Sequence, residues 1–241
     1  MEKYTKSYTI TSYECDSTRK LRLRTIFNFF QDLADDHANE MGLGYHECIK
    51  RGIGWIGGAY HVEFLDLPKW EDKITLDTWP SGKTAATGIR DFQMKDAMGN
   101  PIINATSQWV LVDLTRMRPV PIVKHLGEYD LVEDRAFESC FQNINAIERV
   151  DFEKCVTVRY DDIDLYKHVN NAVYPTLIYD GLPPEFVQQY QLKELQIIFK
   201  KPALITDEIC IKTQIEDNRT IHQLFNKTGE VEFARIQVLW K

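Results

Sequence analysis

The segments HVEF (residues 61–64) and DKITL (72–76) return later in the chain as QIIF (196–199) and DEICI (207–211). The matching residues are separated by 135 positions throughout. A constant separation across two segments indicates an internal duplication, which decides the architecture before any local feature does. The chain of 241 residues is therefore expected to hold two copies of one structural plan, of about 120 residues each.

A second pair of segments supports the duplication. ATSQWVL at residues 105–111 resembles ARIQVL at residues 234–239, and each follows a turn that contains a glycine, Gly99 or Gly229. Any one of these short matches could arise by chance. Their shared order along the chain makes duplication the better interpretation.

Each copy has the same expected order of elements. An alternating strand comes first, at residues 6–13 and 155–160, and is followed by aspartates in a loop and then by a helix. The first helix should end near Met41 and Gly42, because glycine suits a helix C-cap, and the second should cover residues 169–180. Four or five strands rich in β-branched and aromatic residues follow each helix. The apolar residues of the first helix recur at helical spacing: Leu21, Leu23, Ile26, Phe27, Phe30, Leu33, Ala34 and Ala38.

A strand, a helix and an antiparallel meander in each copy predict an α+β protein. A long curved sheet wrapped around one apolar helix buries that helix on most sides, which is the hotdog fold. We therefore expect two tandem hotdog domains, at residues 1–122 and 153–241, each with a curved antiparallel sheet wrapped around a central helix. Residues 123–152 are charged and irregular and should link the two domains. Three apolar side chains could anchor this linker as a packed arm: Phe137, Phe141 and Ile144.

Charge and composition exclude several classes of protein. The chain carries 29 basic and 36 acidic residues, a formal net charge of −7, and an acidic surface repels nucleic acid. No apolar stretch approaches the length of a membrane span, and the first residues show no signal-peptide pattern. We therefore expect a cytoplasmic protein that binds neither nucleic acid nor a membrane.

The five cysteines are Cys15, Cys48, Cys140, Cys155 and Cys210. Their odd number, their wide spacing and the absence of a CxxC pair argue against a disulfide framework and against a zinc site. We expect free thiols, and none adjoins a base in the sequence as a nucleophilic cysteine requires. Neither a metal nor an organic cofactor is expected.

The stretch that is most informative about chemistry is YDDIDLYKHVNNAVY, residues 160–174. Asp164 can orient or activate water, and His168 can donate a hydrogen bond or shuttle a proton. The expected helix starts directly afterwards, so its first N–H groups could polarise a carbonyl oxygen, with Asn170 and Asn171 as caps or substrate contacts. The alternative is structural, because aspartates before a helix often only cap it and a lone histidine is often only packed.

The pattern D-x-D-x-x-x-H-V-N-N-x-x-Y at residues 162–174 resembles the catalytic segment of acyl-ACP thioesterases, the tandem-hotdog enzymes of plants and bacteria. Many hotdog thioesterases share the His-Val-Asn-Asn part alone, but the likeness covers nearly the whole chain. Elements of the first half resemble that family's N-terminal hotdog in content and order, and together they are more specific. They are GW (54–55), PKWED (68–72), DTW (77–79), RDF (90–92), SQWV (107–110) and LTR (114–116).

The resemblance implies a thioesterase that releases free fatty acid from acyl carrier protein, with Asp164 and His168 as catalytic residues. The chain also departs from the family pattern. Tyr166 stands where the family usually has an asparagine, and its hydroxyl could act as a donor or merely close the site. Pro202 and Ala203 align with a position where the family often has a glutamate, followed in plant members by a cysteine. Asp164 would then act as base or nucleophile together with His168.

The first half is expected to have lost the chemistry. Asp16 matches the aspartates of the second half, but RKLR at residues 19–22 follows it in place of the His-Val-Asn-Asn motif. We expect this half to shape the acyl tunnel, whose depth would set the preferred chain length. Asp32 and Asp35 on its helix should be solvated, as charged helix residues usually are.

The expected partner, acyl carrier protein, is acidic, so docking should need a local basic patch. The tandem arrangement supplies both hotdogs in one chain, so a monomer would suffice, and a homodimer through sheet edges is also possible. The candidate docking residues are Arg19, Lys20, Arg22, Arg24, Lys200 and Lys201, although they could also be ordinary surface charges.

Other functions remain open on the sequence alone. One is a thioesterase acting on acyl-CoA or aryl-CoA. Another is a degenerate hotdog that binds acyl groups without hydrolysis, which the departures at Tyr166 and Pro202 favour. A hotdog dehydratase is a weaker alternative, because the sequence shows no matching arrangement of acid and histidine.

Overall fold

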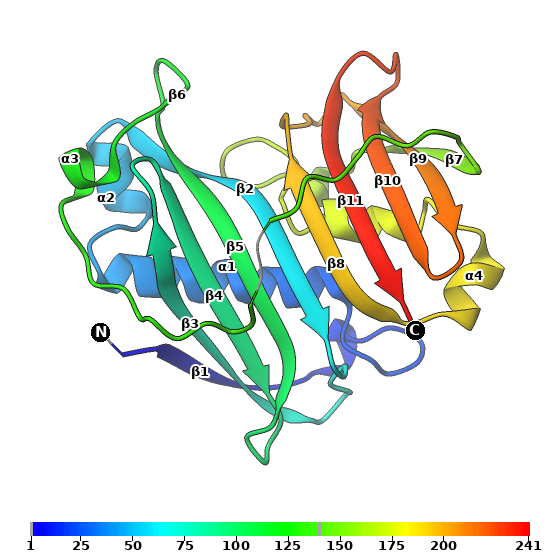
Figure 1. The fold of residues 1–241 in the computed structure, drawn as a ribbon, viewed down its shortest axis with the longest axis horizontal. Helices are drawn as coiled ribbons and strands as arrows, with labels where there is room; N and C mark the ends of the chain where they lie inside the picture. Colours follow the sequence, from blue (N-terminus) through cyan, green and yellow to red (C-terminus); the bar gives the residue numbers. More distant parts are fainter. Residues whose placement is uncertain (1, 139–140) are drawn as a thin grey trace. The chain divides into compact units, whose positions relative to one another are not determined.

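Within each half of the chain, the strands pair in an antiparallel arrangement (Figure 1). The strands are Tyr4–Thr9 (β1), Ile53–Phe64 (β2), Lys73–Lys83 (β3), Thr87–Lys95 (β4), Pro101–Asp113 (β5), Arg118–Pro119 (β6), Phe152–Thr157 (β7), Leu192–Phe199 (β8), Glu208–Glu216 (β9), Arg219–Asn226 (β10) and Glu232–Trp240 (β11). The computed structural model describes residues 2–138 and 141–241. The chain divides into two units, Met1–Cys140 and Phe141–Lys241.

The two sheets have the same strand order, which confirms the duplication predicted from the sequence. The order is β1-β3-β4-β5-β2 in the first unit, where β6 also pairs with β5, and β7-β9-β10-β11-β8 in the second. The repeated segments lie at matching places, since HVEF and QIIF end β2 and β8 while DKITL and DEICI lead into β3 and β9. A curved antiparallel sheet packed around a helical segment in each unit is the hotdog fold that we expected.

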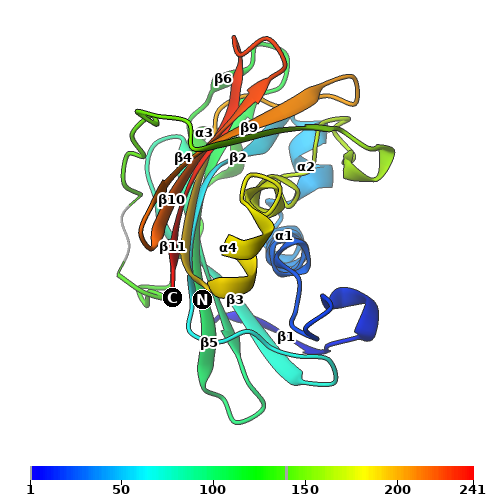
Figure 2. The same ribbon diagram turned by 90° about the vertical axis from the view of Figure 1, so that its right-hand side faces the viewer.

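The central helix of the first unit is α1 (Leu23–Glu40), which lies against one face of the sheet (Figure 2). Its apolar residues recur every three or four positions, so one side of the helix is buried. Phe30 of α1 stacks on Phe92 of β4 with ring centroids 4.7 Å apart. Each such side chain contributes about 1.5–3 kcal/mol when it is fully buried. The helix ends where the sequence predicted, because Gly42 adopts a φ of 71° after the C-cap Met41.

The α-helix predicted at residues 169–180 of the second unit was wrong. Residues 171–173 form a turn, and only Tyr174–Ile178 (η3) is helical, as a 3-10 helix. Pro175 explains why no helix runs through from residue 169, because proline has no N–H to bond the carbonyl four residues earlier; in the first turn of η3 that N–H is not needed. The segment is still largely buried, and η3 contacts β11 of its own sheet. A glycine follows at 181 because a Cβ there would lie 2.5 Å from Cγ2 of Ile211.

The remaining helices are short: α2 (Tyr45–Lys50), α3 (Ile122–Leu126), α4 (Pro184–Gln189) and the 3-10 helices η1 (Ser12–Glu14) and η2 (Tyr160–Asp162). In the part of the chain that the structure describes, no helix is long and apolar enough to cross a membrane.

The expected linker is a packed arm rather than a free tether. In the first unit it runs along the face of the sheet opposite α1, where the ring of Phe137 lies 5.0 Å from that of His61 (Figure 2). Arg135 donates from Nε to the buried carboxylate of Asp91 at 2.7 Å. In the second unit Ile144 is 2 % exposed, and its carbonyl accepts a hydrogen bond from Arg235, while Phe141 is half-buried. The two units divide inside this linker, between residues 140 and 141.

The expectation of free thiols was wrong for Cys155 and Cys210, which form a disulfide. These residues lie directly opposite each other on the paired strands β7 and β9, with Cα atoms 3.9 Å apart. Their separation of 55 positions in the sequence hides this arrangement, because strand pairing and not chain spacing brings the two sulfurs together. Cys15 and Cys48 are free and buried, and Cys140 lies outside the described residues.

Candidate active site

Asp164 and His168 stand at the two ends of one tight turn. The N–H of Asp164 donates to the carbonyl of His168 at 2.8 Å, and the N–H of Lys167 donates to the carbonyl of Asp164 at 3.0 Å. Lys167 has a φ of 64°, the left-handed conformation that closes the turn. A β-bridge between Ile163 and Val169 continues the pairing beyond the turn. The backbone therefore holds the predicted carboxylate and imidazole residues in a fixed register.

The carboxylate of Asp164 is only partly used by the turn. Its Oδ1 accepts the N–H groups of Tyr166 at 2.8 Å and of His168 at 3.3 Å. Its Oδ2 and the imidazole of His168 make no hydrogen bond to any of residues 2–138 or 141–241. Both residues are half-buried. Oδ2 of Asp164 and the imidazole of His168 are thus left available to a substrate.

The first unit contains the same turn without the histidine. The N–H of Asp16 donates to the carbonyl of Lys20 at 2.9 Å, and the N–H of Arg19, whose φ is 67°, donates to the carbonyl of Asp16 at 3.0 Å. Oδ1 of Asp16 accepts the N–H groups of Thr18 at 2.8 Å and of Lys20 at 3.1 Å. Lys20 therefore corresponds to His168. The aspartate that ties the turn together belongs to the fold of both units, and the histidine belongs to the second alone.

The correspondence extends to the surroundings of the two turns. The N–H of Val169 donates to the carbonyl of Ala203 at 2.8 Å, as the N–H of Leu21 donates to that of Pro68 at 2.8 Å. Each turn also follows a short 3-10 helix, η1 or η2. The exposure differs, because Asp16 is exposed. Only the second turn thus combines a sheltered carboxylate with an imidazole.

The two asparagines have different structural positions. The N–H of Asn170 donates to the carbonyl of Asp162 at 2.8 Å, and its Oδ1 accepts the N–H of Ala172 at 2.8 Å. Asn170 therefore caps the turn that begins the buried segment, as asparagine commonly does. Asn171 is half-buried. The helix N-terminus that we expected to polarise a carbonyl is absent, because η3 begins only at Tyr174.

Tyr166 lies at the tip of the turn and is 43 % exposed, next to Leu165, which is 86 % exposed. Its backbone N–H is one of the two donors to Asp164. The exposure of the ring is more consistent with a residue that borders the site than with one enclosed in it.

Tyr174 is a residue of the site that sequence reasoning quoted without giving it a role. It is 2 % exposed, and its hydroxyl accepts the N–H of Ala203 at 3.0 Å. Burial raises the pKa of Tyr174 to about 12, and the negative charges of Asp164 and Asp207 act in the same direction. Tyr174 thus connects the Asp164 turn with the position where a family glutamate was expected. Its place as the last residue of the motif at residues 162–174 was the sequence feature that could have indicated this role.

Asp162 was also passed over. Its side chain is 6 % exposed, and Oδ2 accepts the backbone N–H of Arg159 at 3.0 Å and the Nε of the same residue at 3.3 Å. Such donors stabilise a buried carboxylate. Asp162 is the last residue of η2 and binds the N-cap residue Arg159, so it holds the short helix that directly precedes Asp164.

The described cysteines do not offer a thiolate nucleophile. Burial raises the pKa of the Cys48 thiol to about 11 and raises that of Cys15 above its ordinary value. Cys155 and Cys210 are joined to each other. None of the cysteines in the described part of the chain is therefore a candidate nucleophile.

The sequence matches two profiles of one family. The acyl-ACP thioesterase N-terminal domain matches residues 1–129, and the acyl-ACP thioesterase C-terminal domain matches residues 146–241. Oleoyl-acyl carrier protein thioesterase 2 of Arabidopsis thaliana is 24 % identical over 251 residues, which cover 96 % of this chain and 68 % of that protein. The chain spans about half to two thirds of the length of the curated relatives that it matches.

Solved structures share the fold over nearly the whole chain. The 12:0-ACP thioesterase from Umbellularia californica superposes with a TM-score of 0.87 and 20 % identity, covering 99 % of this chain and 97 % of that one. An acyl-ACP thioesterase from Bacteroides thetaiotaomicron superposes with a TM-score of 0.85 and 20 % identity, covering 98 % and 97 %.

Proposed function

Because the chain belongs to the acyl-ACP thioesterase family, we propose that it hydrolyses the thioester bond between a fatty acyl group and acyl carrier protein. The products are a free fatty acid and a carrier protein with a free thiol. Membership of the family supports the proposed type of reaction. The turn from Asp164 to His168 supports the proposed location of the active site.

In the proposed reaction, a water molecule adds to the acyl carbon, the carbon–sulfur bond breaks, and the leaving sulfur takes up a proton. Asp164 accepts the proton of the water through Oδ2, because Oδ1 is held by two backbone N–H groups. His168 donates a hydrogen bond to the carbonyl oxygen or delivers the proton to the sulfur. Direct attack by Asp164 on the acyl carbon would use the same oxygen, expel the sulfur as a thiolate that takes up a proton, and leave an anhydride between the acyl group and Asp164; water would then hydrolyse this anhydride to give the same products.

The observation that carries the assignment is the difference between the two turns. Both units keep the aspartate and its backbone hydrogen bonds, so those bonds alone mark a structural role. The second unit adds His168 and shelters Asp164 from solvent, whereas the first has Lys20 and an exposed Asp16. We therefore assign catalysis to residues 153–241, with Asn170 and Tyr174 positioning the turn and with Asn171 and Tyr166 bordering the substrate.

The first unit, residues 1–122, is proposed to shape the acyl tunnel without taking part in the chemistry. Its interior is aromatic, since Phe27, Phe30 and Phe92 pack around Tyr60 with ring centroids 5.2–6.4 Å from that of Tyr60. Asp32 and Asp35 on α1 are exposed, as the sequence predicted. Apolar surroundings of this kind suit a hydrocarbon chain.

Docking of an acidic carrier protein is proposed to use exposed basic residues. Lys200 is engaged with Glu232 at 2.6 Å, and Arg22 donates from Nε to the carbonyl of Cys15 at 2.7 Å. Of the six candidate residues, Arg19 and Lys201 are exposed and make neither of these contacts, so they are the stronger candidates. We keep the proposal of a monomer or homodimer in the cytoplasm, without cofactor or metal.

To test the proposal, the purified protein is given acyl carrier protein thioesters of several chain lengths. Hydrolysis is measured as the rate at which free thiol and free fatty acid are released. Matched acyl-CoA thioesters are measured in parallel. Turnover of the carrier-protein series with at least tenfold higher kcat/KM than the CoA series supports the proposal. Preference for CoA would make the chain an acyl-CoA thioesterase instead. Tight acyl binding without turnover would make it a binding protein.

A further inference from the structure

The disulfide lies where the second sheet is most weakly held. β7 is the edge strand of the second unit, and among the described residues it pairs with β9 alone. None of its six residues is fully buried, and four are exposed. Few buried apolar side chains therefore hold β7 in place, and edge strands with so little burial open readily.

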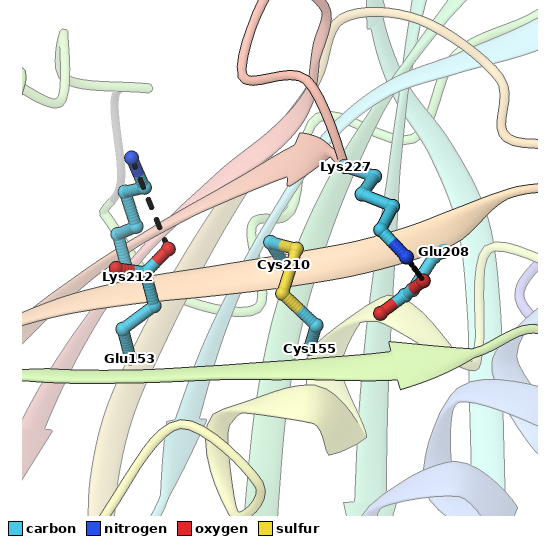
Figure 3. Close-up of a disulfide and its surroundings, with 6 residues drawn as sticks. All are labelled: Glu153, Cys155, Glu208, Cys210, Lys212 and Lys227. Carbon is cyan, nitrogen blue, oxygen red and sulfur yellow. Dashed lines mark hydrogen bonds and ion pairs between the residues drawn. A yellow bond between two sulfur atoms is a disulfide. The ribbon is translucent and has the colours of Figure 1, made fainter.

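Cys155 and Cys210 link this edge strand covalently to the sheet (Figure 3). Cys155 is exposed, whereas Cys210 is 5 % exposed. A reductant can therefore approach the bond from the Cys155 side, and exposed disulfides are the ones that exchange with external thiols. The structural disulfides of stable proteins are typically protected from such attack.

The charges beside the bond permit the approach of a thiolate. The carboxylate of Glu208 lies within 4.8 Å of both sulfur atoms, and on its own it would repel an incoming thiolate. Lys227 pairs with Glu208 at 2.8 Å, and Lys212 lies close to Glu153, with nitrogen and oxygen 3.9 Å apart (Figure 3). The acidic groups next to the disulfide are thus matched by lysines.

The disulfide joins the two segments that lead to the candidate active site. Asp164 follows Cys155 by nine residues, and the connection passes through Val158, whose N–H donates to the carbonyl of Asp207 at 3.3 Å. On the other strand, the residues before β9 include Ala203, which accepts the N–H of Val169. Loosening of β7 would therefore act on both sides of the Asp164 turn.

We propose that the Cys155–Cys210 disulfide is a site of thiol–disulfide exchange with a dithiol reductant, and that its cleavage loosens the turn carrying Asp164 and His168. The effect on catalysis rests on the proposed function, whereas the exchange and the loosening do not. The reducing systems of a cytoplasm, the compartment expected from the sequence, contain dithiols of this class.

The exchange proceeds in two balanced steps. A thiolate of the dithiol attacks Sγ of Cys155, a mixed disulfide forms, and Cys210 leaves as a thiolate that takes up a proton. The second thiol of the reductant, as a thiolate, then attacks its own sulfur in the mixed disulfide and releases Cys155, which is protonated in turn. The protein disulfide gains two electrons and two protons, and the dithiol becomes a disulfide.

The experiment compares the full chain in the oxidised form, after treatment with dithiothreitol, and as the Cys155→Ser/Cys210→Ser double variant. Thiols are counted after unfolding, and backbone hydrogen exchange is followed by mass spectrometry over residues 152–170. We expect dithiothreitol to release two additional thiols from the native protein and to speed exchange in this segment at least tenfold. Exchange in α1 of the first unit should stay unchanged.

The double variant should exchange like the reduced protein and should not respond to dithiothreitol. Cys48→Ser, which removes a buried free thiol, should respond like the natural chain. A disulfide that resists dithiothreitol in the folded protein would overturn the exchange site. Equal exchange rates in residues 152–170 before and after reduction would overturn the loosening.

Turnover of acyl carrier protein thioesters is measured on the same samples. We expect reduction to lower kcat several-fold and reoxidation to restore it. Unchanged kcat together with faster exchange would overturn the control of catalysis. If both forms lack turnover, the proposed function fails, while the thiol count and the exchange rates still decide the redox site.

Discussion

Asp164 and Asp16 hold the same backbone turn in the two halves of the chain. In each case Oδ1 accepts two backbone N–H groups within the turn, and the residue before the end of the turn has a φ between 64° and 67°. One of these aspartates precedes His168 and is half-buried, whereas the other precedes Lys20 and is exposed. The chain therefore provides an internal control that separates structure from chemistry.

Replacing Asp164 should separate its two roles. Asp164→Asn keeps an oxygen that can accept the N–H groups of Tyr166 and His168 but removes the charge that takes a proton. We expect kcat to fall at least a hundredfold, which is the usual range for loss of a general base, with little change in the free energy of unfolding. Asp164→Ala should lose activity and also about 1 kcal/mol of stability, because the turn loses its acceptor. Steady-state kinetics and urea unfolding measure both quantities.

The matched control is Asp16→Asn with Asp16→Ala. These variants should change stability in the same way as their counterparts at Asp164 and leave kcat within about twofold of the natural chain, since loss of a catalytic group costs far more than that. A comparable loss of kcat in Asp16→Asn would show that the carboxylates of both turns matter for reasons other than proton transfer.

His168→Ala is expected to lower kcat by a factor of about 10²–10⁴, the range for loss of a catalytic acid or base. KM should change little, because the imidazole makes no hydrogen bond to the described part of the chain that would shape the site. The corresponding change in the first unit, Lys20→Ala, should leave kcat unaltered. An active His168→Ala enzyme would remove the imidazole from the mechanism.

Tyr174→Phe removes the hydroxyl that accepts the N–H of Ala203. The N–H would remain buried without an acceptor, which costs about 1–3 kcal/mol. We therefore expect a lower free energy of unfolding. We also expect a lower kcat, because the carbonyl of Ala203 accepts the N–H of Val169, the residue that follows His168. Tyr13→Phe is a suitable control, since Tyr13 is 78 % exposed. Unfolding free energies that are equal in the two variants would contradict a structural role for this hydroxyl.

His222 should make the protein sensitive to mild acid. Burial lowers the pKa of His222 to about 3, and its ring nitrogens lie 2.8 Å from the hydroxyl oxygens of Thr213 and Thr220. The unfolded chain binds a proton near the ordinary pKa of 6.5 while the folded chain does not. Stability contributed by the neutral ring is therefore complete above pH 6.5 and is lost as the pH falls from 6.5 toward 3. At pH 5 the loss from this group is about 2 kcal/mol.

Urea unfolding at pH 7 and pH 5 tests this expectation. His222→Gln should be less stable at pH 7 but should lose less stability between the two pH values than the natural chain does. His46→Gln changes an exposed ring and should leave the pH dependence as it was. Some acid sensitivity remains in every variant, because burial and Arg90 lower the pKa of His37 to about 4. Identical pH dependence in His222→Gln and the natural chain would show that another group is responsible.

Charge reversal at Lys201 should affect the carrier protein more than the acyl group. Lys201→Glu is expected to raise KM for acyl carrier protein thioesters several-fold, with a larger effect at low ionic strength, and to leave KM for acyl-CoA unchanged. Lys193→Glu, at another exposed lysine of the second unit, provides the control for a general change in net charge. Equal effects of the two variants would place carrier docking elsewhere.

Two predictions were wrong for different physical reasons. One overlooked a proline within an apolar helical pattern, and the other overlooked a contact between residues far apart in the sequence. The repeat predicted that the two halves share one plan, and the matching strand orders of the two units confirm it. The helix expected at residues 169–180 was wrong because Pro175 cannot donate the backbone hydrogen bond that a continuous α-helix through that position requires, although the apolar spacing favours a helix. The disulfide was missed because Cys155 and Cys210 become neighbours only through the pairing of β7 with β9.

The sequence by itself determined the duplicated hotdog plan, the end of the first helix and the candidate pair Asp164 and His168, because these depend on periodicity, glycine and a local motif. Tertiary structure alone decided that the Asp164 turn has a twin at Asp16, that Tyr174 supports Ala203, and that a covalent bond fastens the edge strand. These relationships join residues that are distant along the chain. Only the packing within the second unit brings Tyr174 to Ala203 and Cys155 to Cys210, and only the backbone hydrogen bonds show that the two turns are alike.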